Sequence, residues 1–233
     1  MTTNDLNGLS ALGIARRQLH FILIADCSGS MSGDKIASLN HAMAAALPAM
    51  REAAADNAET QVMVRVLRFG DGADWHIGTP VPVDALQWSD LTADGETHLG
   101  TALLLAASVL NPENMPGRQL PPVIVLVSDG QPTDDFAGGL AALLASPYGK
   151  KSVRIAVAIG SDADLDVLDA FIAHPEFKVL QAHNAQELTN RIRWATTAPV
   201  KTVSSPLTIE GGAVAELARE AVSQAGATGE LVW

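Results

Sequence analysis

The sequence has one cysteine, few basic residues and no long apolar run, and each of these shortages excludes a class of protein. The lone cysteine, Cys27, cannot form a disulfide within the chain, so nothing indicates an oxidising compartment. With 15 basic against 26 acidic residues, the net charge is −11. Nucleic acid is therefore not an expected partner, because phosphate binding needs a basic surface.

Membrane insertion and secretion are disfavoured as well. The apolar runs, for example 102–107, are much shorter than the roughly 20 residues that span a bilayer. Residues 1–15 are polar and lack the basic-then-apolar plan of a signal peptide. We therefore expect a soluble, cytoplasmic protein that makes no membrane contact.

Apolar residues nevertheless make up 48% of the 233 residues, which is enough for the core of one large α/β domain. We predict an N-terminal segment over 1–18, this domain over 19–197, and a C-terminal strap with a short helix over 198–233. The strap is predicted from the proline, serine and threonine residues of 198–209. The short helix is predicted from an apolar stripe over 213–223, which is expected to pack on the parent domain, with docking of a partner as the alternative.

Short apolar runs alternate with segments of helical periodicity along the domain. Continuous apolar runs at 20–25 and 122–127 are typical of strands buried on both faces of a parallel sheet. Further strands are predicted at 61–69, 75–79, 153–159 and 177–180, and helices at 34–55, 99–110, 134–145, 165–172 and 185–196. Pro48 predicts a kink or a restart within the first helix. This alternation predicts a doubly wound, mostly parallel six-stranded sheet with one antiparallel edge strand, 75–79, and helices on both faces.

Oxygen-bearing side chains follow the two strands that are predicted to be fully buried. Asp26, Ser28 and Ser30 come directly after 20–25, and Asp129 comes shortly after 122–127. Ligands of open α/β sheets bind beyond the carboxyl ends of the strands, at the point where the strand order reverses. If these two strands are neighbours, the two carboxylates converge there, and Thr97 arrives from the loop that opens the helix 99–110.

The five candidate ligands, Asp26, Ser28, Ser30, Thr97 and Asp129, offer only oxygen. Such a set suits a hard cation, Mg²⁺ first and Mn²⁺ or Ca²⁺ as alternatives. Three of the five are neutral hydroxyls, so a bound ion would keep an attraction for one more carboxylate from outside the protein. Three neighbouring residues, Gly29, Glu96 and His98, are expected at the rim of the site.

The pattern Asp26-x-Ser28-x-Ser30 with Thr97 and Asp129 resembles the metal-ion-dependent adhesion site of von Willebrand factor A domains, and the order of elements is similar over 19–194. Segments 24–31 and 125–134 resemble the bacterial branch of that family, and within it the TerY-type proteins associated with tellurium resistance.

This resemblance implies direct ligation by Ser28, Ser30 and Thr97, with one or both aspartates acting through water. It also implies a scaffold that works beside a kinase or a phosphatase in bacterial stress signalling. One departure concerns Glu96, because relatives often have Gly-Gly-Thr where this chain has Gly-Glu-Thr.

Other readings of the same residues explain less. Aspartate and serine after a strand are common in turns and helix caps. A monothiol redox motif formed by Cys27 and Ser30 would leave the aspartates unexplained. If Asp26 were the phosphoacceptor of a receiver domain, an acidic cluster and a lysine after a later strand would be expected, and neither is evident. A serine hydrolase would need Gly-x-Ser-x-Gly, which does not surround Ser28 or Ser30. We expect a metal-dependent protein-binding module that docks a partner Asp or Glu and is not an enzyme.

Two alternatives from other classes stay open. The first is a hydrolase or phosphatase that uses the same ion to activate water, with Glu96 or His98 as the base. The second is a structural subunit whose ion only stabilises the fold.

Overall fold

Six strands form one mixed sheet in the computed structural model, which describes residues 16–174 and 177–204. The strands, in the order β3-β2-β1-β4-β5-β6 across the sheet, are β1 (Arg17–Asp26), β2 (Thr60–Phe69), β3 (Ala73–Pro82), β4 (Val123–Ser128), β5 (Val153–Ile159) and β6 (Leu180–Ala182). Among these described strands, β3 is the antiparallel one, and it lies at the edge beside β2. The predicted sheet is therefore confirmed.

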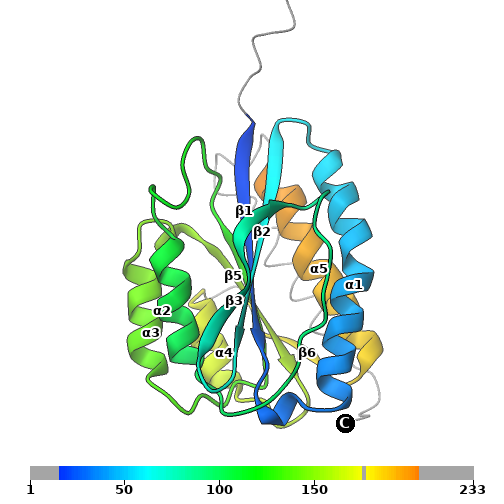
Figure 1. Cartoon of the computed structure of the whole chain (residues 1–233), viewed down its shortest axis with the longest axis vertical. Helices are drawn as coiled ribbons and strands as arrows, with labels where there is room; N and C mark the ends of the chain where they lie inside the picture. Colours follow the sequence, from blue (N-terminus) through cyan, green and yellow to red (C-terminus); the bar gives the residue numbers. More distant parts are fainter. Residues whose placement is uncertain (1–15, 175–176, 205–233) are drawn as a thin grey trace, which may run out of the picture.

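Helices cover both faces of this sheet (Figure 1). They are α1 (Asp34–Ala55), α2 (Leu99–Val109), α3 (Phe136–Ala145), α4 (Leu165–Ile172) and α5 (Ala185–Ser204), with short 3-10 turns at η1 (Gly29–Met31) and η2 (Gly149–Lys151). In Figure 1, α1 and α5 lie side by side on one face, and α2, α3 and α4 lie on the other. In the part of the chain that the structure describes, no helix combines the length and the apolar character needed to cross a membrane.

The strand order reverses at the middle of the sheet, between β1 and β4. All of β4 and most of β1 are buried, as continuous apolar strands of a parallel sheet should be. The two strands pair in parallel with Ala25 opposite Val127, so Asp26 and Ser128 leave the sheet next to each other. The two strands are neighbours, which was the condition for the two carboxylates to converge, and this edge is where a ligand site is expected.

The loop between β3 and α2 is tied to α1 over most of its length. The side chain of Asn40 brackets Leu91, because its Nδ2 donates to the Leu91 carbonyl at 2.9 Å and its Oδ1 accepts the Leu91 N–H at 2.8 Å. Near the start of the loop, Arg51 donates to the carbonyls of Val83 and Leu86 at 3.1 and 2.6 Å. A segment without regular structure is thus held in place by side chains of α1.

The sequence-based prediction of the last strand and the last helix was wrong in detail. Only Leu180 of the predicted strand 177–180 belongs to β6, and Phe177 and Val179 are buried outside it, so their apolar pattern reflects burial. The final helix does not end at 196 but continues to Ser204, so residues 198–204 are helical and do not begin a strap.

Prolines do not interrupt the two long helices. α5 runs through Pro199, and burial of Ala195 and Val200 beside it offsets the backbone hydrogen bond that a proline removes. α1 likewise continues through Pro48 without the restart that was predicted as one possibility. The segment 1–15 and the predicted helix 213–223 lie outside the described residues.

Candidate metal centre

The first candidate ligand, Asp26, is fully buried at the end of β1, and each of its two carboxylate oxygens accepts a hydrogen bond. Its Oδ1 accepts the backbone N–H of Ser28 at 2.9 Å, and its Oδ2 accepts the hydroxyl of Ser128 at 2.5 Å. Burial raises the pKa of Asp26 above its ordinary value, the two serines oppose that rise, and the charge of Asp129 adds to it. The carboxylate therefore joins the loop after β1 to the end of β4.

The two serines of the motif lie together beside Asp26. Their Oγ atoms are 2.9 Å apart, with Ser28 buried and Ser30 exposed. Gly29 between them donates its N–H to the carbonyl of Gly95 at 2.8 Å. A Cβ at Gly29 would lie 3.2 Å from that oxygen, so the absence of a side chain allows the two loops to approach closely. Gly29, predicted at the rim, thus connects the serine loop to the loop that carries Thr97.

Thr97 is buried and is held by the loop after β4. Its N–H donates to Thr133 Oγ1 at 3.2 Å, and its carbonyl accepts the N–H of Thr133 at 2.9 Å. The next residue of that loop, Asp134, caps α2 by accepting the N–H groups of Gly100 and Thr101, each at 2.7 Å. These bonds fix the start of α2, and with it Thr97, against the end of β4.

Asp129, directly after β4, differs because one of its oxygens is left without a donor. The residue is 2% exposed, and its Oδ1 has no hydrogen-bond partner among the described residues. Its Oδ2 faces Lys35 Nζ at 3.9 Å, which is an ion pair but too long for a hydrogen bond. A buried carboxylate oxygen without a donor is costly, and a cation at this point would remove the cost. The donor set therefore fits a hard, oxygen-preferring cation.

Carboxylates alone could not hold such a cation here. Within 16–174 and 177–204, no three His, Cys, Asp or Glu side chains gather into a set that could bind a metal. The hydroxyls of Ser28, Ser30 and Thr97 would have to complete the coordination.

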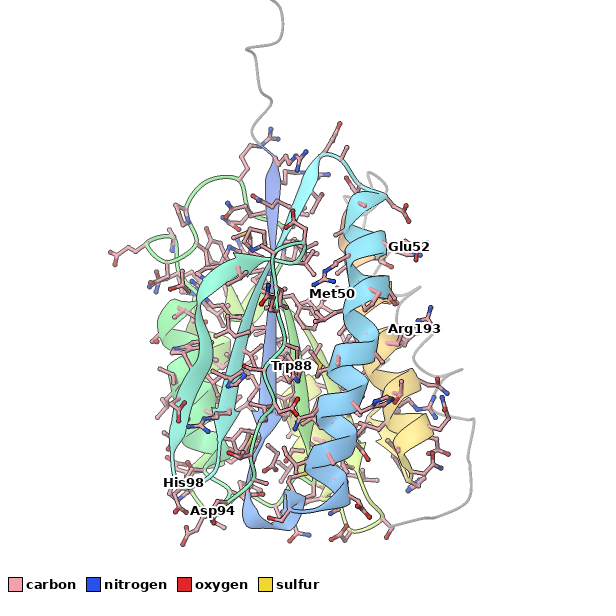
Figure 2. All side chains as sticks on the ribbon, turned by 45° about the vertical axis from the view of Figure 1, so that its right-hand side comes forward. Met50, Glu52, Trp88, Asp94, His98 and Arg193 are labelled. Carbon is pink, nitrogen blue, oxygen red and sulfur yellow. The ribbon has the colours of Figure 1, made fainter. Side chains whose placement is uncertain are left out.

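Glu96 and His98 lie at the rim and interact with each other. Glu96 Oε2 is 3.1 Å from His98 Nε2 and accepts the hydroxyl of Thr133 at 3.3 Å, and its side chain is 64% exposed. Figure 2 shows His98 and Asp94 together at one end of the molecule. The predicted rim positions of Glu96 and His98 thus correspond to a solvent-facing pair on the Thr97 loop.

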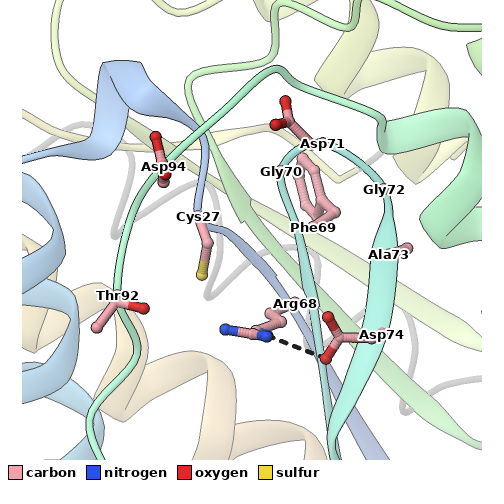
Figure 3. Close-up of a pocket in the computed structure, with 10 residues that line it drawn as sticks. All are labelled: Cys27, Arg68, Phe69, Gly70, Asp71, Gly72, Ala73, Asp74, Thr92 and Asp94. Atoms are coloured by element: carbon pink, nitrogen blue, oxygen red, sulfur yellow. Dashed lines mark hydrogen bonds and ion pairs between the residues drawn. The ribbon is translucent and has the colours of Figure 1, made fainter.

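A pocket of about 430 Å³ lies beside this centre, between the β2–β3 turn and the Thr97 loop. Figure 3 shows the Cys27 thiol facing the same space as the Arg68 guanidinium, which pairs with Asp74 at 3.0 Å. Burial raises the pKa of Cys27 to about 12, and the neighbouring charge of Asp26 adds to the rise. A thiol that stays protonated at neutral pH argues against the redox reading of the motif.

Three positioning residues were not predicted: Lys35, Ser128 and Thr133. Ser128 and Thr133 flank Asp129 in sequence, so their place in the loop after β4 was a usable signal. Lys35 belongs to α1 and reaches Asp129 only through the tertiary fold, and no pattern in the sequence indicates that contact.

Comparison with known proteins shows which proteins this chain is similar to. Residues 21–131 match the family model of the von Willebrand factor type A domain, and this segment holds all five candidate ligands. A human relative, inter-alpha-trypsin inhibitor heavy chain H6, is 26% identical over 171 residues, which make up 67% of this chain and 12% of that protein.

Two solved structures share the fold. A von Willebrand factor type A protein from Catenulispora acidiphila has a TM-score of 0.60 at 18% identity, covering 79% of this chain and 43% of that one. Proximal thread matrix protein 1 from the mussel byssus, solved with a zinc-occupied MIDAS motif, has a TM-score of 0.56 at 15% identity, covering 80% of this chain and 46% of that one. The chain thus spans less than half the length of these relatives, and the part of it that resembles the von Willebrand factor type A domain is residues 21–131.

Proposed function

We propose that this chain is a protein-binding module that docks an Asp or Glu of a partner protein on a divalent cation. The cation, Mg²⁺ or alternatively Mn²⁺ or Ca²⁺, would be held by the five candidate ligands Asp26, Ser28, Ser30, Thr97 and Asp129. The observation that carries the proposal is the buried Oδ1 of Asp129 at the switch point of the sheet, which has no hydrogen-bond donor within residues 16–174 and 177–204. The zinc-occupied motif of the mussel protein, which shares this fold, supports a metal at this place.

The chain's own groups would divide the work. Ser28, Ser30 and Thr97 offer neutral oxygens, and Asp129 offers a free anionic one. Asp26 already accepts two hydrogen bonds, so its role is to orient the serine loop and to bind through water. A bound divalent ion supplies a Lewis acid with room for one more oxygen ligand. The rest of the chain is acidic, at −11 overall, so an acidic partner is disfavoured everywhere except at the cation.

The finer assignment rests on the resemblance of 24–31 and 125–134 to TerY-type proteins. We infer a cytoplasmic scaffold in bacterial stress or tellurite-resistance signalling, with a kinase or a phosphatase of the same pathway as the partner and no catalytic activity of its own.

A titration of metal into wild type and variants tests the centre. Mg²⁺ or Mn²⁺ at about 100 times its dissociation constant should stabilise the fold by about 2.7 kcal/mol, and Thr97→Ala should lose that response while its circular dichroism stays native. Thr189→Ala is the matched control, because the Thr189 hydroxyl bonds only within α5, to Ala185. Identical metal responses in wild type and Thr97→Ala would contradict the metal site.

The docking step needs a second experiment. Proteins captured from a lysate of the native host in Mg²⁺ and lost in chelator are identified by mass spectrometry, purified, and tested against wild type and Ser28→Ala. Binding that needs both the metal and Ser28 supports the proposal. A purified partner that binds equally well in chelator places the docking face elsewhere.

One observation favours a second function, a metal-dependent hydrolase or phosphatase. Glu96 and His98 form a pair 3.1 Å apart at the rim, which is a plausible source of a base. Against this, in the described structure no hydrogen bond joins either side chain to the candidate ligands. Mg²⁺-dependent turnover of phosphoesters that disappears in His98→Ala would establish this function, and we expect none.

A further inference from the structure

The ammonium group of Lys35 lies between two carboxylates at the metal edge of the sheet. Its Nζ is 3.9 Å from Asp129 Oδ2 and 3.7 Å from Asp162 Oδ1. The Lys35 side chain is 15% exposed and that of Asp162 is 64% exposed, so Asp129 is the buried member of the trio. Lys35 is therefore the charge that the fold itself supplies to Asp129.

The fold makes room for this lysine. Gly160, at the end of β5, has a positive φ of 87°, and a Cβ there would lie 3.3 Å from Lys35 Nζ and 2.8 Å from Asp162 Oδ1. The loop after β5 is also joined to the loop after β4, because Asp164 N–H donates to the Asp129 carbonyl at 2.8 Å. Lys35 thus reaches from α1 across the ends of two strands into a fixed position.

Charge counting shows what this lysine does to a metal centre. Asp26 and Asp129 bring two negative charges to the candidate ligand set, and a divalent ion would cancel them. The ammonium of Lys35 adds one positive charge between Asp129 and Asp162, so the loaded centre is one unit more positive than it would be without the lysine. The same ammonium would repel the incoming ion, with which it shares one carboxylate.

We propose that Lys35 sets the specificity of this centre, because its positive charge weakens cation binding at Asp129 and strengthens the attraction of the loaded centre for a partner's carboxylate. The inference rests on the proposed metal site and adds a residue that governs it. The proposal makes a distinctive prediction: removal of the ammonium must raise the affinity for the metal and lower the affinity of the loaded centre for a carboxylate.

The metal arm of the test is a calorimetric titration of Mn²⁺ into wild type and Lys35→Met. Repulsion between an ammonium and a divalent ion at such short range is worth about tenfold in affinity even at the dielectric of water, so Lys35→Met should bind Mn²⁺ about tenfold more tightly. Without metal, Lys35→Met should melt about 3 °C lower, because Asp129 then has no counter-charge.

The carboxylate arm uses acetate as the probe. Water-proton relaxation of the Mn²⁺-loaded protein reports displacement of bound water as acetate is added. The Mn²⁺-loaded Lys35→Met should bind acetate about threefold more weakly than the loaded wild type, since the positive charge of Lys35 is gone. Lys35→Arg, which keeps the charge, should stay close to wild type in both arms.

Lys151→Met is the matched control, because Lys151 is exposed in η2 at the opposite end of β5. It should change neither affinity. If wild type binds no Mn²⁺, the proposed function itself fails. If wild type binds Mn²⁺ but Lys35→Met binds it equally well or more weakly, or binds acetate more tightly, the metal site stands and the role of Lys35 is overturned. If Lys35→Met does not fold, Lys35→Gln replaces it in both arms.

Discussion

The two aspartates that follow the central strands of the sheet have opposite environments. Asp26, after β1, accepts a hydrogen bond on each carboxylate oxygen, from Ser28 and from Ser128. Asp129, after β4, has one oxygen without a donor and the other facing Lys35 at 3.9 Å. Both are buried, at 0% and 2% exposure, so burial does not distinguish them.

The difference shows how one sheet edge can be both rigid and able to bind. The Asp26 carboxylate is closed by the protein's own donors and serves to join two loops. The Asp129 carboxylate lacks a donor at one oxygen among the described residues. A buried polar atom without a partner persists only when the surrounding structure holds it in place or when a ligand supplies the missing interaction. We therefore assign the structural role to Asp26 and the ligand-facing role to Asp129.

Substitution of each aspartate by alanine gives the largest expected effects. Asp26→Ala removes two hydrogen bonds to a charged acceptor, each worth about 2 kcal/mol, so the free energy of unfolding in chelator should fall by about 4 kcal/mol. For Asp129→Ala the free energy of unfolding in chelator should fall by only about 1 kcal/mol, because the hydrogen bonding of the Asp129 carboxylate is incomplete in the wild type. Urea unfolding curves with chelator and with Mg²⁺ measure both.

The two variants must also differ in how they respond to metal. Asp129→Ala should lose the stabilisation by Mg²⁺ completely although its fold is nearly intact. Ser128→Ala also tests the structural arm: it removes one of the two bonds of Asp26 together with the bond that Ser128 Oγ accepts from Gly130 N–H, so it should show at least half the loss of Asp26→Ala. If Asp129→Ala and Asp26→Ala lose equal stability in chelator, the contrast between the two aspartates is incorrect.

A buried polar pair, His20 and Arg65, lies elsewhere in the sheet, and among the described residues His20 Nε2 has no hydrogen-bond partner. His20 is 2% exposed in β1, and its Nδ1 lies 3.4 Å from Nη1 of Arg65, which also donates to the carbonyls of Gly78 and Asn114. Burial, and then the charge of Arg65, lower the pKa of His20 from 6.5 to about 4. The native protein therefore keeps this imidazole neutral.

Stability should accordingly depend on pH through His20. Below pH 6.5 His20 is protonated in the unfolded chain, whereas in the folded chain it stays neutral down to about pH 4. The contribution of neutral His20 to the free energy of unfolding is therefore fully present above pH 6.5 and is lost as the pH falls from 6.5 to about 4. A shift of this size corresponds to about 3 kcal/mol at the lower limit. Urea unfolding in chelator at several pH values measures the slope, and His20→Gln should remove most of it. A wild-type stability that stays flat between pH 7 and 4 would contradict a buried neutral His20.

Much of the fold, and the position of the candidate ligands Asp26 and Asp129 at the ends of neighbouring strands, could be predicted from sequence, for a local reason. The run 21–25 is apolar throughout and is followed at once by Asp26, so the strand, its end and a candidate ligand can be read from one short segment. The same holds for 122–127 and Asp129. What such a segment cannot show is which donors surround a carboxylate. The Lys35–Asp129 pair joins residues 94 positions apart, and only the packing of α1 against the sheet brings them together.

The loops are the second part of the structure that could not be predicted from the sequence. The segment between β3 and Thr97 has no periodicity, yet Asn40 and Arg51 of α1 hold it firmly. The last strand was misplaced because Phe177 and Val179 are buried without pairing, and an apolar pattern alone does not separate burial from strand formation.

The smallest expected effect comes from Glu96, at the rim of the site. A carboxylate near the ion should strengthen cation binding, but Glu96 is 64% exposed and already interacts with His98 and Thr133. Solvent screening therefore limits its contribution, and Glu96→Gly should weaken Mn²⁺ binding by only about two- to threefold, less at high salt, with stability changed by about 0.5 kcal/mol or less. Glu96→Gln separates the charge from the added backbone freedom of glycine and should show the same loss of affinity. Calorimetric titrations at 50 mM and 500 mM salt measure the Mn²⁺ affinity of both Glu96 variants, with His98→Ala run beside them. Unchanged or tighter binding in both Glu96 variants would show that this carboxylate does not reach the ion. A loss as large as that of Asp129→Ala would instead make Glu96 a ligand, and the open coordination would then lie on the Thr97 loop rather than after β4.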